Sequence, residues 1–328
     1  MKSQKKPTLK DIAKLAGISV NSASRALKQK KNISLKTQEK VRKIADKLGY
    51  IPDMRASALR AGKMDVIAII YDNLNNPYYS MMLDQITAKL FNYKYETMIF
   101  IDRHSIGYLS LEIAKRVISF HVAGIITFIE PTIEAKAIID NSKTPIVLIG
   151  RNGVNTNTTS IYSDDYEGGK LAAQTFINLG LKNLLYYTEH KDLDIDNIRH
   201  KGFEDCVCAS FNKKPLVVIG DEENKAKDLL KIQINNNPVD GIFCFSDLLA
   251  FDVLEVLYDL NIINKVKVIG YDNIQKSFRY PIRVSSIAPD NERIVAETIS
   301  TILDMIENKN YELKLIKINV AFYQGTTC

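Results

Sequence analysis

The stretch from residue 8 to residue 27 reads Thr8-Leu-Lys-Asp-Ile-Ala-Lys-Leu-Ala-Gly17 and then Ile18-Ser-Val-Asn-Ser-Ala-Ser-Arg-Ala-Leu27. Apolar residues recur at helical spacing in its first half, and Thr8 with Asp11 forms the pattern of a capping box. Gly17 supplies a tight turn, and Ser19 is a favourable N-cap for a second helix. The order of these signals predicts a helix-turn-helix.

A third helix is predicted after Ser34, because serine is a favourable N-cap residue. We expect its buried stripe at Val41, Ile44, Ala45 and Leu48, with Gly49 just beyond its end. Three short helices with one shared core would make a compact module in which the second helix reads DNA.

The basic residues are concentrated at one end of the chain. Residues 1–63 contain 13 Lys and 4 Arg against 4 acidic residues, a net charge of +13, whereas the whole chain carries +6. Residues 64–328 therefore carry a net charge of −7. Such segregation is typical of a module that neutralises phosphates, and a merely solvated Lys-rich surface is the alternative.

Length and composition indicate a globular protein of two or three domains. The chain has 328 residues, of which 46% are hydrophobic and 25% are charged. No apolar run approaches the ~20 residues of a membrane span, and no secretion signal is recognisable, so we expect a cytoplasmic protein. The four cysteines, Cys206, Cys208, Cys244 and Cys328, lack the spacing of a disulfide framework or a zinc site.

Eight short apolar runs, separated by helix-length amphipathic stretches, fill the rest of the chain. They are residues 66–70, 96–101, 124–128, 145–149, 184–187, 216–219, 241–245 and 267–271. This alternation indicates parallel sheets covered on both faces, in which ligands bind beyond the carboxyl ends of the strands. Those ends are polar here, at 71–73, 151–152, 246–247 and 272–273, which suits a hydroxyl-rich ligand.

Nine motifs occur along the chain in a fixed order. They are Thr8-Leu-Lys-Asp-Ile-Ala13, Ser24-Arg25, Ser34-Leu-Lys-Thr-Gln-Glu-Lys-Val41, Leu48-Gly-Tyr-Ile-Pro52, Asn76-Pro-Tyr-Tyr79, Asp164-Asp-Tyr-Glu-Gly-Gly169, Arg199-His-Lys-Gly-Phe203, Ser246-Asp247 and Gly270-Tyr-Asp272. With this set the chain resembles the LacI/GalR family of bacterial transcription regulators over essentially its full length. The resemblance implies an all-α helix-turn-helix headpiece and an α/β periplasmic-binding-protein-like body of two doubly wound parallel-sheet subdomains.

The resemblance also implies domain boundaries. The DNA-binding headpiece is expected at residues 1–50, a hinge helix or linker at 51–63, and the effector-binding and dimerisation domain at 64–328. Within this body, the N-subdomain would take residues 64–162 and 291–319, and the C-subdomain residues 163–290 and 320–328. The chain would then cross between the subdomains three times, near residues 163, 290 and 320.

The DNA contacts are expected on the headpiece and the hinge. In the major groove Asn can pair with adenine and Arg with guanine, while the pair Ser22-Ala23 replaces the family's usual Thr-Val and leaves the operator sequence open. The resemblance makes Leu59 the wedge between base steps, with an ordinary linker as the alternative. The predicted contacts are Thr8, Ser19, Val20, Asn21, Ser22, Ser24, Arg25, Ala56, Leu59 and Arg60.

The resemblance assigns the effector site as well. Arg199 matches an arginine that forks onto effector hydroxyls or carboxylates, Asp272 matches an acidic ligand, and the tyrosines could stack on a ring. Salt bridges or strand-end caps are the alternatives for the polar residues, and core packing for the tyrosines. The predicted set is Asp72, Tyr78, Tyr79, Arg151, Tyr162, Arg199, Ser246 and Asp272.

The sequence therefore predicts a cytoplasmic, nucleoid-associated repressor that is not an enzyme. We expect it to bind double-stranded operator DNA as a homodimer, to release it when a sugar or sugar phosphate closes the cleft, and to need no cofactor or metal, because metal, triad and phosphate-loop spacings are missing. The alternatives left open are a regulator that responds to a nucleobase or a phosphoprotein co-repressor, a solute-binding receptor and a nucleotide-dependent α/β enzyme.

Overall fold

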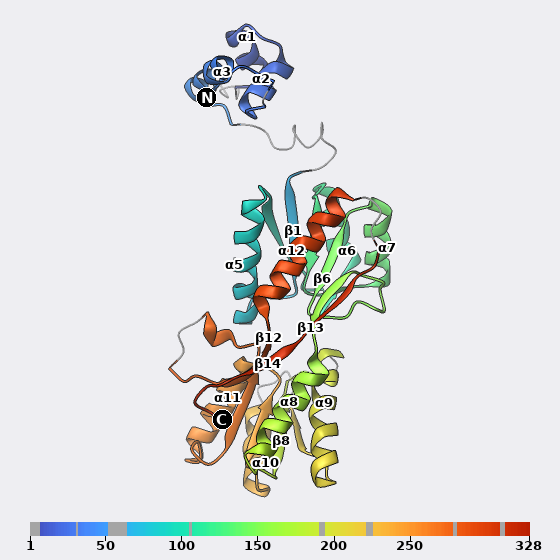
Figure 1. The fold of residues 1–328 in the computed structure, drawn as a ribbon, viewed down its shortest axis with the longest axis vertical. Coiled ribbons are helices and arrows are strands. Elements are labelled where there is room, and N and C mark those ends of the chain that lie inside the picture. The colour runs from blue at the N-terminus through green and yellow to red at the C-terminus, as the bar shows by residue number, and fades with distance from the viewer. Residues whose placement is uncertain are drawn as a thin grey trace. The chain divides into compact units, whose positions relative to one another are not determined.

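The computed structural model describes residues 7–30, 32–51, 64–104, 107–189, 194–220, 226–277, 281–308 and 312–328. The chain divides into two compact units, Met1–Met64 and Asp65–Cys328, and Figure 1 shows the elements of each. None of the described helices combines the length and apolarity that a bilayer span requires.

The first unit consists of three helices, α1 (Leu9–Ala16), α2 (Val20–Leu27) and α3 (Leu35–Leu48), around a core that includes Ile12 and Val41. Thr8 and Asp11 form the capping box of α1, and Ser19 and Ser34 cap α2 and α3. Gly17 and Gly49 end their helices with φ of 69° and 62°, the left-handed conformation that glycine adopts without strain. The predicted helix-turn-helix and third helix are thus confirmed.

The first sheet of the second unit has the strand order β13-β7-β6-β4-β1-β2, and all its pairs are parallel. The strands are β1 (Val66–Tyr71), β2 (Glu96–Ile101), β4 (Gly124–Thr127), β6 (Ile146–Ile149), β7 (Ser160–Ser163) and β13 (Leu315–Ile318). Its helices are α5 (Pro77–Asn92), α6 (Leu111–Ser119), α7 (Ile133–Ser142) and α12 (Asn291–Glu307), and the short strands β3 (Tyr108–Leu109) and β5 (Glu130–Pro131) form a separate pair. Ile86 of α5 and Ile299 of α12 pack with Ile126 of β4 in one core.

The second sheet has the order β14-β12-β11-β10-β8-β9, with β14 antiparallel at its edge. The strands are β8 (Leu184–Thr188), β9 (Leu216–Ile219), β10 (Gly241–Cys244), β11 (Lys267–Tyr271), β12 (Ser285–Pro289) and β14 (Val320–Tyr323). The helices are α8 (Asp165–Asn178), α9 (Asp194–Phe211), α10 (Ala226–Asn236), α11 (Asp247–Asp259) and the short η1 (Ile274–Lys276). Two separate cores, around Leu254 and around Phe203, accompany this sheet.

The chain passes between the two sheets at three places, from β7 to α8, from β12 to α12 and from β13 to β14. These connections lie close together between the two subdomains (Figure 1). All eight predicted strands are present, with ends that differ by a residue at most. The helix-turn-helix module with a body of two mainly parallel, helix-covered sheets confirms the predicted fold class.

Candidate functional site

The second helix of the first unit presents a polar face to solvent. Asn21 and Arg25 are exposed one helical turn apart, whereas Ala23 and Ala26 are buried against the other two helices. At the start of the helix the Ser19 hydroxyl accepts a hydrogen bond from the Ser22 backbone amide at 3.0 Å. The exposed N-terminus and the long polar side chains are the features with which such a helix contacts DNA.

Contacts from α1 and α3 fix the surroundings of α2. The Gln38 side chain donates to the carbonyl oxygens of Lys30 and Ile33 at 3.3 and 2.8 Å, and the Lys40 ammonium donates to the Ala16 carbonyl at 2.9 Å. Thr8 is exposed at the start of α1, where its hydroxyl donates to Asp11 at 2.6 Å. Of the remaining predicted DNA contacts, Val20, Ser22 and Ser24 are half-buried, while Ala56, Leu59 and Arg60 lie outside the described residues.

In the second unit, Arg199 of α9 is held in a buried ion pair. Its Nε and Nη2 donate to one oxygen of Asp165 at 3.2 and 2.6 Å, and its Nη1 donates to the Phe245 carbonyl. The guanidinium carbon lies 3.3 Å from the ring centroid of Tyr271 and 4.6 Å from that of Phe245. The Ser163 hydroxyl donates to the other Asp165 oxygen at 2.9 Å. The Arg199 guanidinium is thus held by hydrogen bonds at its edges and by contacts with aromatic rings on its faces.

Two glycines bring Asp165 and Arg199 together although 34 positions separate them. A Cβ atom on Gly169 of α8 would overlap the carbonyl oxygen of Arg199, and one on Gly202 of α9 would overlap the carbonyl oxygen of Tyr166. The backbones of α8 and α9 can therefore touch only because both positions lack a side chain. The family motifs that contain these glycines thus have a packing reason here.

Asp272 follows β11 in a conformation that is uncommon for residues other than glycine, with φ of 96°. Burial raises the pKa of its carboxyl group to about 6, and Asp165 adds to the rise while Arg199 opposes it. Among the described residues, no donor is hydrogen-bonded to this carboxylate. Burial also works against the charge of Arg199, but Asp165, Tyr271 and Asp272 outweigh it, so the pKa of Arg199 is raised and the guanidinium stays charged.

Ser246 and Asp247 follow β10 and start α11. The Ser246 hydroxyl accepts from the Leu249 amide at 3.3 Å, so it caps the helix, as one of the alternatives for this residue proposed. Asp247 accepts from the Ser286 hydroxyl at 2.7 Å and from the Ile274 amide at 2.9 Å, and burial raises its pKa. Asp247 thereby anchors the loop that contains Asp272.

On the N-subdomain side, Asp72 follows β1 and its carboxylate accepts from the amides of Asn73 at 2.7 Å and Gly107 at 3.3 Å. Tyr79 packs on the aromatic core, with its ring centroid 5.2 Å from that of Tyr71. Arg151 is only 9% exposed and lies over the Tyr108 ring at 5.4 Å. No carboxylate of the described residues forms an ion pair with Arg151.

Charged residues of both subdomains affect the pKa values of Tyr78 and Tyr79. Burial raises the pKa of each phenol; the nearby charges are those of Asp272, Asp165 and Arg199 for Tyr78 and of Asp72, Arg151 and Asp272 for Tyr79. Six of the eight predicted effector residues therefore share one region between the subdomains: Asp72, Tyr78, Tyr79, Arg151, Arg199 and Asp272. Ser246 adjoins this region through Phe245, whereas Tyr162 lies in β7 opposite Lys317 of β13.

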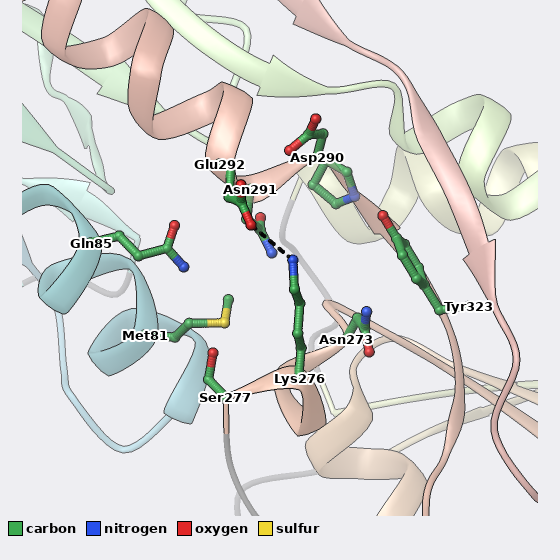
Figure 2. Close-up of a pocket in the computed structure, with 10 residues that line it drawn as sticks. Met81, Gln85, Asn273, Lys276, Ser277, Asp290, Asn291, Glu292 and Tyr323 are labelled. Atoms are coloured by element: carbon green, nitrogen blue, oxygen red, sulfur yellow. Dashed lines mark hydrogen bonds and ion pairs between the residues drawn. The ribbon is translucent and has the colours of Figure 1, made fainter.

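A cavity of about 220 Å³ borders the same region between α5 and η1 (Figure 2). Met81 and Gln85 of α5 line it on one side, and Asn273, Lys276 and Ser277 on the other. Figure 2 shows the Lys276 ammonium directed at Glu292, with which it forms an ion pair of 3.0 Å. Residues of both subdomains therefore line the cavity. Asn273 directly follows Asp272 in the sequence, and Met81 lies about one helical turn after Tyr78 in α5.

Sequence reasoning did not single out Asp165 or the anchoring role of Asp247, although both stand in the motifs Asp164-Asp-Tyr and Ser246-Asp247. Their partners, Arg199 and Ser286, are distant in sequence, so only an acidic residue at a helix start was visible. The described residues contain no group of three or more His, Cys, Asp or Glu side chains that could hold a metal ion.

Comparisons with known proteins match both units. Residues 8–53 match the model of bacterial regulatory proteins of the lacI family, and residues 173–328 match that of a periplasmic binding protein-like domain. The chain is 26% identical over 312 residues to the sucrose operon repressor of Lactococcus lactis subsp. lactis, covering 93% of this chain and 95% of the relative. It is 23% identical over 333 residues to the transcriptional repressor PurR of Vibrio atlanticus (strain LGP32), covering 98% of both.

Solved structures show the same fold over the whole chain. The lac repressor bound to ONPG in its repressed state superposes with a TM-score of 0.82 at 18% identity, covering 99% of this chain and 100% of that one. A complex of the transcriptional regulator CelR with cellobiose superposes with a TM-score of 0.70 at 20% identity, covering 98% and 100%. At these identities the likeness concerns the fold.

Proposed function

Because this chain belongs to the LacI family of bacterial regulatory proteins and contains its DNA-binding domain, we propose that it represses transcription at an operator from which a small carbohydrate releases it. The observation that carries the proposal is the pairing of a basic helix-turn-helix, with Asn21 and Arg25 exposed on α2, and a two-subdomain body with polar strand ends. The family consists of transcription regulators, and we propose no enzymatic activity.

The headpiece supplies the DNA-binding half of this function. We assign residues 1–50 to the headpiece and 51–63 to the hinge, and we propose that Thr8, Ser19, Val20, Asn21, Ser22, Ser24 and Arg25 contact the operator, with Ala56, Leu59 and Arg60 from the hinge. The net charge of +13 on residues 1–63 supports several phosphate contacts. Since its target is the chromosome, we propose that the protein acts at the nucleoid in the cytoplasm.

The body supplies the effector site and the dimer contact. We assign residues 64–162 and 291–319 to the N-subdomain and 163–290 and 320–328 to the C-subdomain, with the effector between them at Asp72, Tyr78, Tyr79, Arg151, Tyr162, Arg199, Ser246 and Asp272. The three connections between the sheets would allow the subdomains to close on a ligand. A ligand that binds the closed form better lowers the population that binds the operator, by a coupling of ~1–3 kcal/mol.

We propose that α11 carries the surface for a second copy of the chain. An apolar groove of about 230 Å³ lies beside this helix, lined by Phe251, Leu254, Tyr258 and Ile282, and Tyr258 is 70% exposed. Helix-turn-helix regulators read two half-sites as symmetric dimers, so a second copy is the expected occupant. Among the structures with this fold, one is of the lac repressor dimer on its operator.

A fluorescence-anisotropy titration with DNA from the region upstream of the chain's own gene tests the DNA half of the proposal. The full chain should bind one sequence far more tightly than random DNA, with log K falling linearly with log salt. A variant without residues 1–63 should keep a folded body but bind neither DNA. Equal affinity for all sequences would contradict the proposal.

A screen of small sugars against the protein–DNA complex tests the effector half, and a sugar that acts as proposed releases the DNA. A ligand that instead tightened the complex would favour the second candidate function, a repressor that needs a co-repressor. The two candidates thus differ in the sign of one measured coupling.

A further inference from the structure

The third helix of the headpiece carries most of the positive charge of the three described helices. Helix α3 has five basic residues against two acidic ones, whereas α2 has Arg25 alone and α1 has Lys10 and Lys14. Helix α2 is the one that we propose to read bases, and base reading depends on directed hydrogen bonds rather than on net charge. The charge of α3 is therefore not needed for base reading by α2.

Most of this charge lies on one face of α3. Four exposed lysines, spaced by four, three and four residues, share that face, and we call them the lysine stripe: Lys36, Lys40, Lys43 and Lys47. With a rise of about 1.5 Å per residue, successive lysines are about 4.5 to 6 Å apart along the helix axis. One strand of B-DNA carries a phosphate about every 3.4 Å of its axis, so the two rows of opposite charge have a comparable spacing.

The lysine stripe lies on the side of α3 away from the headpiece core. Val41 of α3 is buried in that core together with Ala23 and Ala26 of α2. Asn21 and Arg25, the exposed polar residues of α2, lie on the side of α2 away from the same core. Because α2 and α3 pack on each other through their buried faces, the lysine stripe and the base-reading face of α2 point in different directions. A straight duplex bound to α2 therefore does not run along the stripe.

The charge of the stripe is only partly neutralised by the rest of the headpiece. Among the residues that the structure describes, the ammonium groups of Lys36 and Lys47 form neither a hydrogen bond nor an ion pair. Lys43 pairs with Glu39 at 2.9 Å, but both side chains are largely exposed, and ion pairs of this kind are weak. Lys40 donates to the Ala16 carbonyl at 2.9 Å and so connects the stripe to the end of α1.

We propose that the lysine stripe binds the phosphates of a second DNA segment while α2 binds the operator, so that the protein bridges two duplexes. This activity goes beyond the proposed function, for which one duplex is enough. The second contact is independent of sequence, because lysine meets phosphates as a flexible point charge and does not read base edges there. A duplex suits the stripe because its negative charges are regular and dense, about one for every 1.7 Å of axis.

A capture assay tests the second contact. The operator duplex, which is the upstream sequence that the full chain binds best, is fixed on beads and saturated with protein. Unbound protein is washed away, and a labelled random duplex is added at about 0.1 M salt. Wild-type protein should retain the random duplex, and log K for retention should fall with log salt by about 0.9 per phosphate contact. If operator-bound protein retained no second duplex, the inference would be overturned while the proposed function stood.

A triple variant with Lys36→Gln, Lys43→Gln and Lys47→Gln separates the stripe from α2. It keeps Lys40, which also supports the end of α1, and glutamine is about as favourable as lysine within a helix. Retention of the random duplex should weaken at least tenfold, while operator affinity changes less than threefold and the melting temperature is unchanged. A comparable loss on both duplexes would place the stripe on the operator's own backbone, and unchanged retention would show a merely solvated face. Either result would overturn the inference.

Two further variants test the sign and the place of the charge. Glu39→Gln removes the carboxylate that pairs with Lys43, so retention of the random duplex should strengthen at least twofold, and a weaker retention would contradict the inference. The matched control combines Lys115→Gln, Lys182→Gln and Lys265→Gln at exposed positions of the body and should retain the duplex like wild type. Labelled poly-glutamate tests the class of partner. If it were retained as tightly as DNA, the stripe would be a general anion surface and the proposed DNA contact would be overturned.

Discussion

Gly169 of α8 lies so close to the backbone of Arg199 in α9 that a Cβ atom at position 169 would overlap the Arg199 carbonyl oxygen. The contact is between backbones, so no side-chain rearrangement can relieve an added methyl group. The position of the Arg199 guanidinium over Tyr271 consequently depends on a residue that has no side chain of its own.

We therefore expect Gly169→Ala to destabilise the body, although alanine normally favours helices over glycine. The loss should be about 1–3 kcal/mol of unfolding free energy, as for overpacked interiors. Urea unfolding of the body measures it, with Gln174→Ala on the exposed side of the same helix as the control. An unchanged midpoint for Gly169→Ala would show that α8 and α9 can separate freely.

Two substitutions in the headpiece should separate the loss of DNA contacts from the loss of helix stability. Arg25→Ala removes an exposed cation of α2, so it should weaken operator binding and leave the melting temperature unchanged. Ser34→Ala removes the side-chain acceptor that caps α3, which should cost about 1 kcal/mol of stability with little direct effect on the contacts. Anisotropy and thermal melting of both variants check this, and a lower melting temperature for Arg25→Ala would argue for a structural role.

Because burial raises the pKa of Asp272 to about 6, its ionised carboxylate destabilises the folded state. In the unfolded chain this carboxyl ionises near pH 4, so between pH 4 and 6 the folded form binds the extra proton and stability falls as the pH rises. Asp272→Asn should remove this dependence and be more stable than wild type at pH 7, by about 1–3 kcal/mol. Thermal melting at pH 5 and pH 7 measures both effects, and parallel curves for the two proteins would refute the prediction.

Sugar binding should have the opposite pH dependence. Because the proposed ligand donates to the ionised carboxylate, affinity should fall as the pH drops through 6, where Asp272 takes up a proton. Calorimetry at pH 7.5 and pH 5, with a sugar that releases the DNA in the effector screen, follows the change, and the affinity of Asp272→Asn should depend less on pH over that range than the wild-type affinity. The neighbouring charged groups, Arg199 and Asp165, form an ion pair whose guanidinium stays protonated throughout. Constant wild-type affinity would exclude a direct bond to Asp272.

The dimer surface can be tested with two equally exposed apolar residues. Tyr258 of α11 is 70% exposed beside the groove and Ile133 of α7 is 75% exposed on the other subdomain. Tyr258→Glu should raise the dimer dissociation constant at least tenfold because a charge would be buried in the interface, whereas Ile133→Glu should not. Sedimentation equilibrium of both variants measures the dimer dissociation constant, and the reverse result would place the interface at α7 instead of α11.

The features that sequence reasoning predicted are those with local signals. The caps and turns at Thr8, Gly17, Ser19 and Ser34 involve residues within one helical turn, so they could be predicted from the local sequence. The strands around Ile69 and Ile242 were recognised because their residues are buried on both faces and therefore almost all apolar. The order of motifs added the subdomain architecture.

The features that were missed depend on distant partners. The strands β7 and β12 contain serines at positions 160, 163, 285 and 286, and β13 contains Lys317, so these three strands show no apolar run, whereas β14 is apolar but only partly buried. Arg199 was predicted as a fork for the ligand, but its pairing with Asp165 across two helices could not be read from either segment alone. The sequence thus predicted which residues lie at the cleft, but it did not predict which of them are already paired with other residues of the protein there.

The passage from β13 to β14 has a consequence for biosynthesis. Leu315–Ile318 adds the edge strand to the first sheet, and Val320–Tyr323 adds the edge strand to the second, with one residue between them. A ribosome must therefore release this segment from its exit tunnel before either sheet can acquire its last strand. Until then both subdomains present an unpaired edge, at β7 and at β12, to which other nascent chains could add. Completion of the two subdomains thus depends on the release of a single stretch of polypeptide.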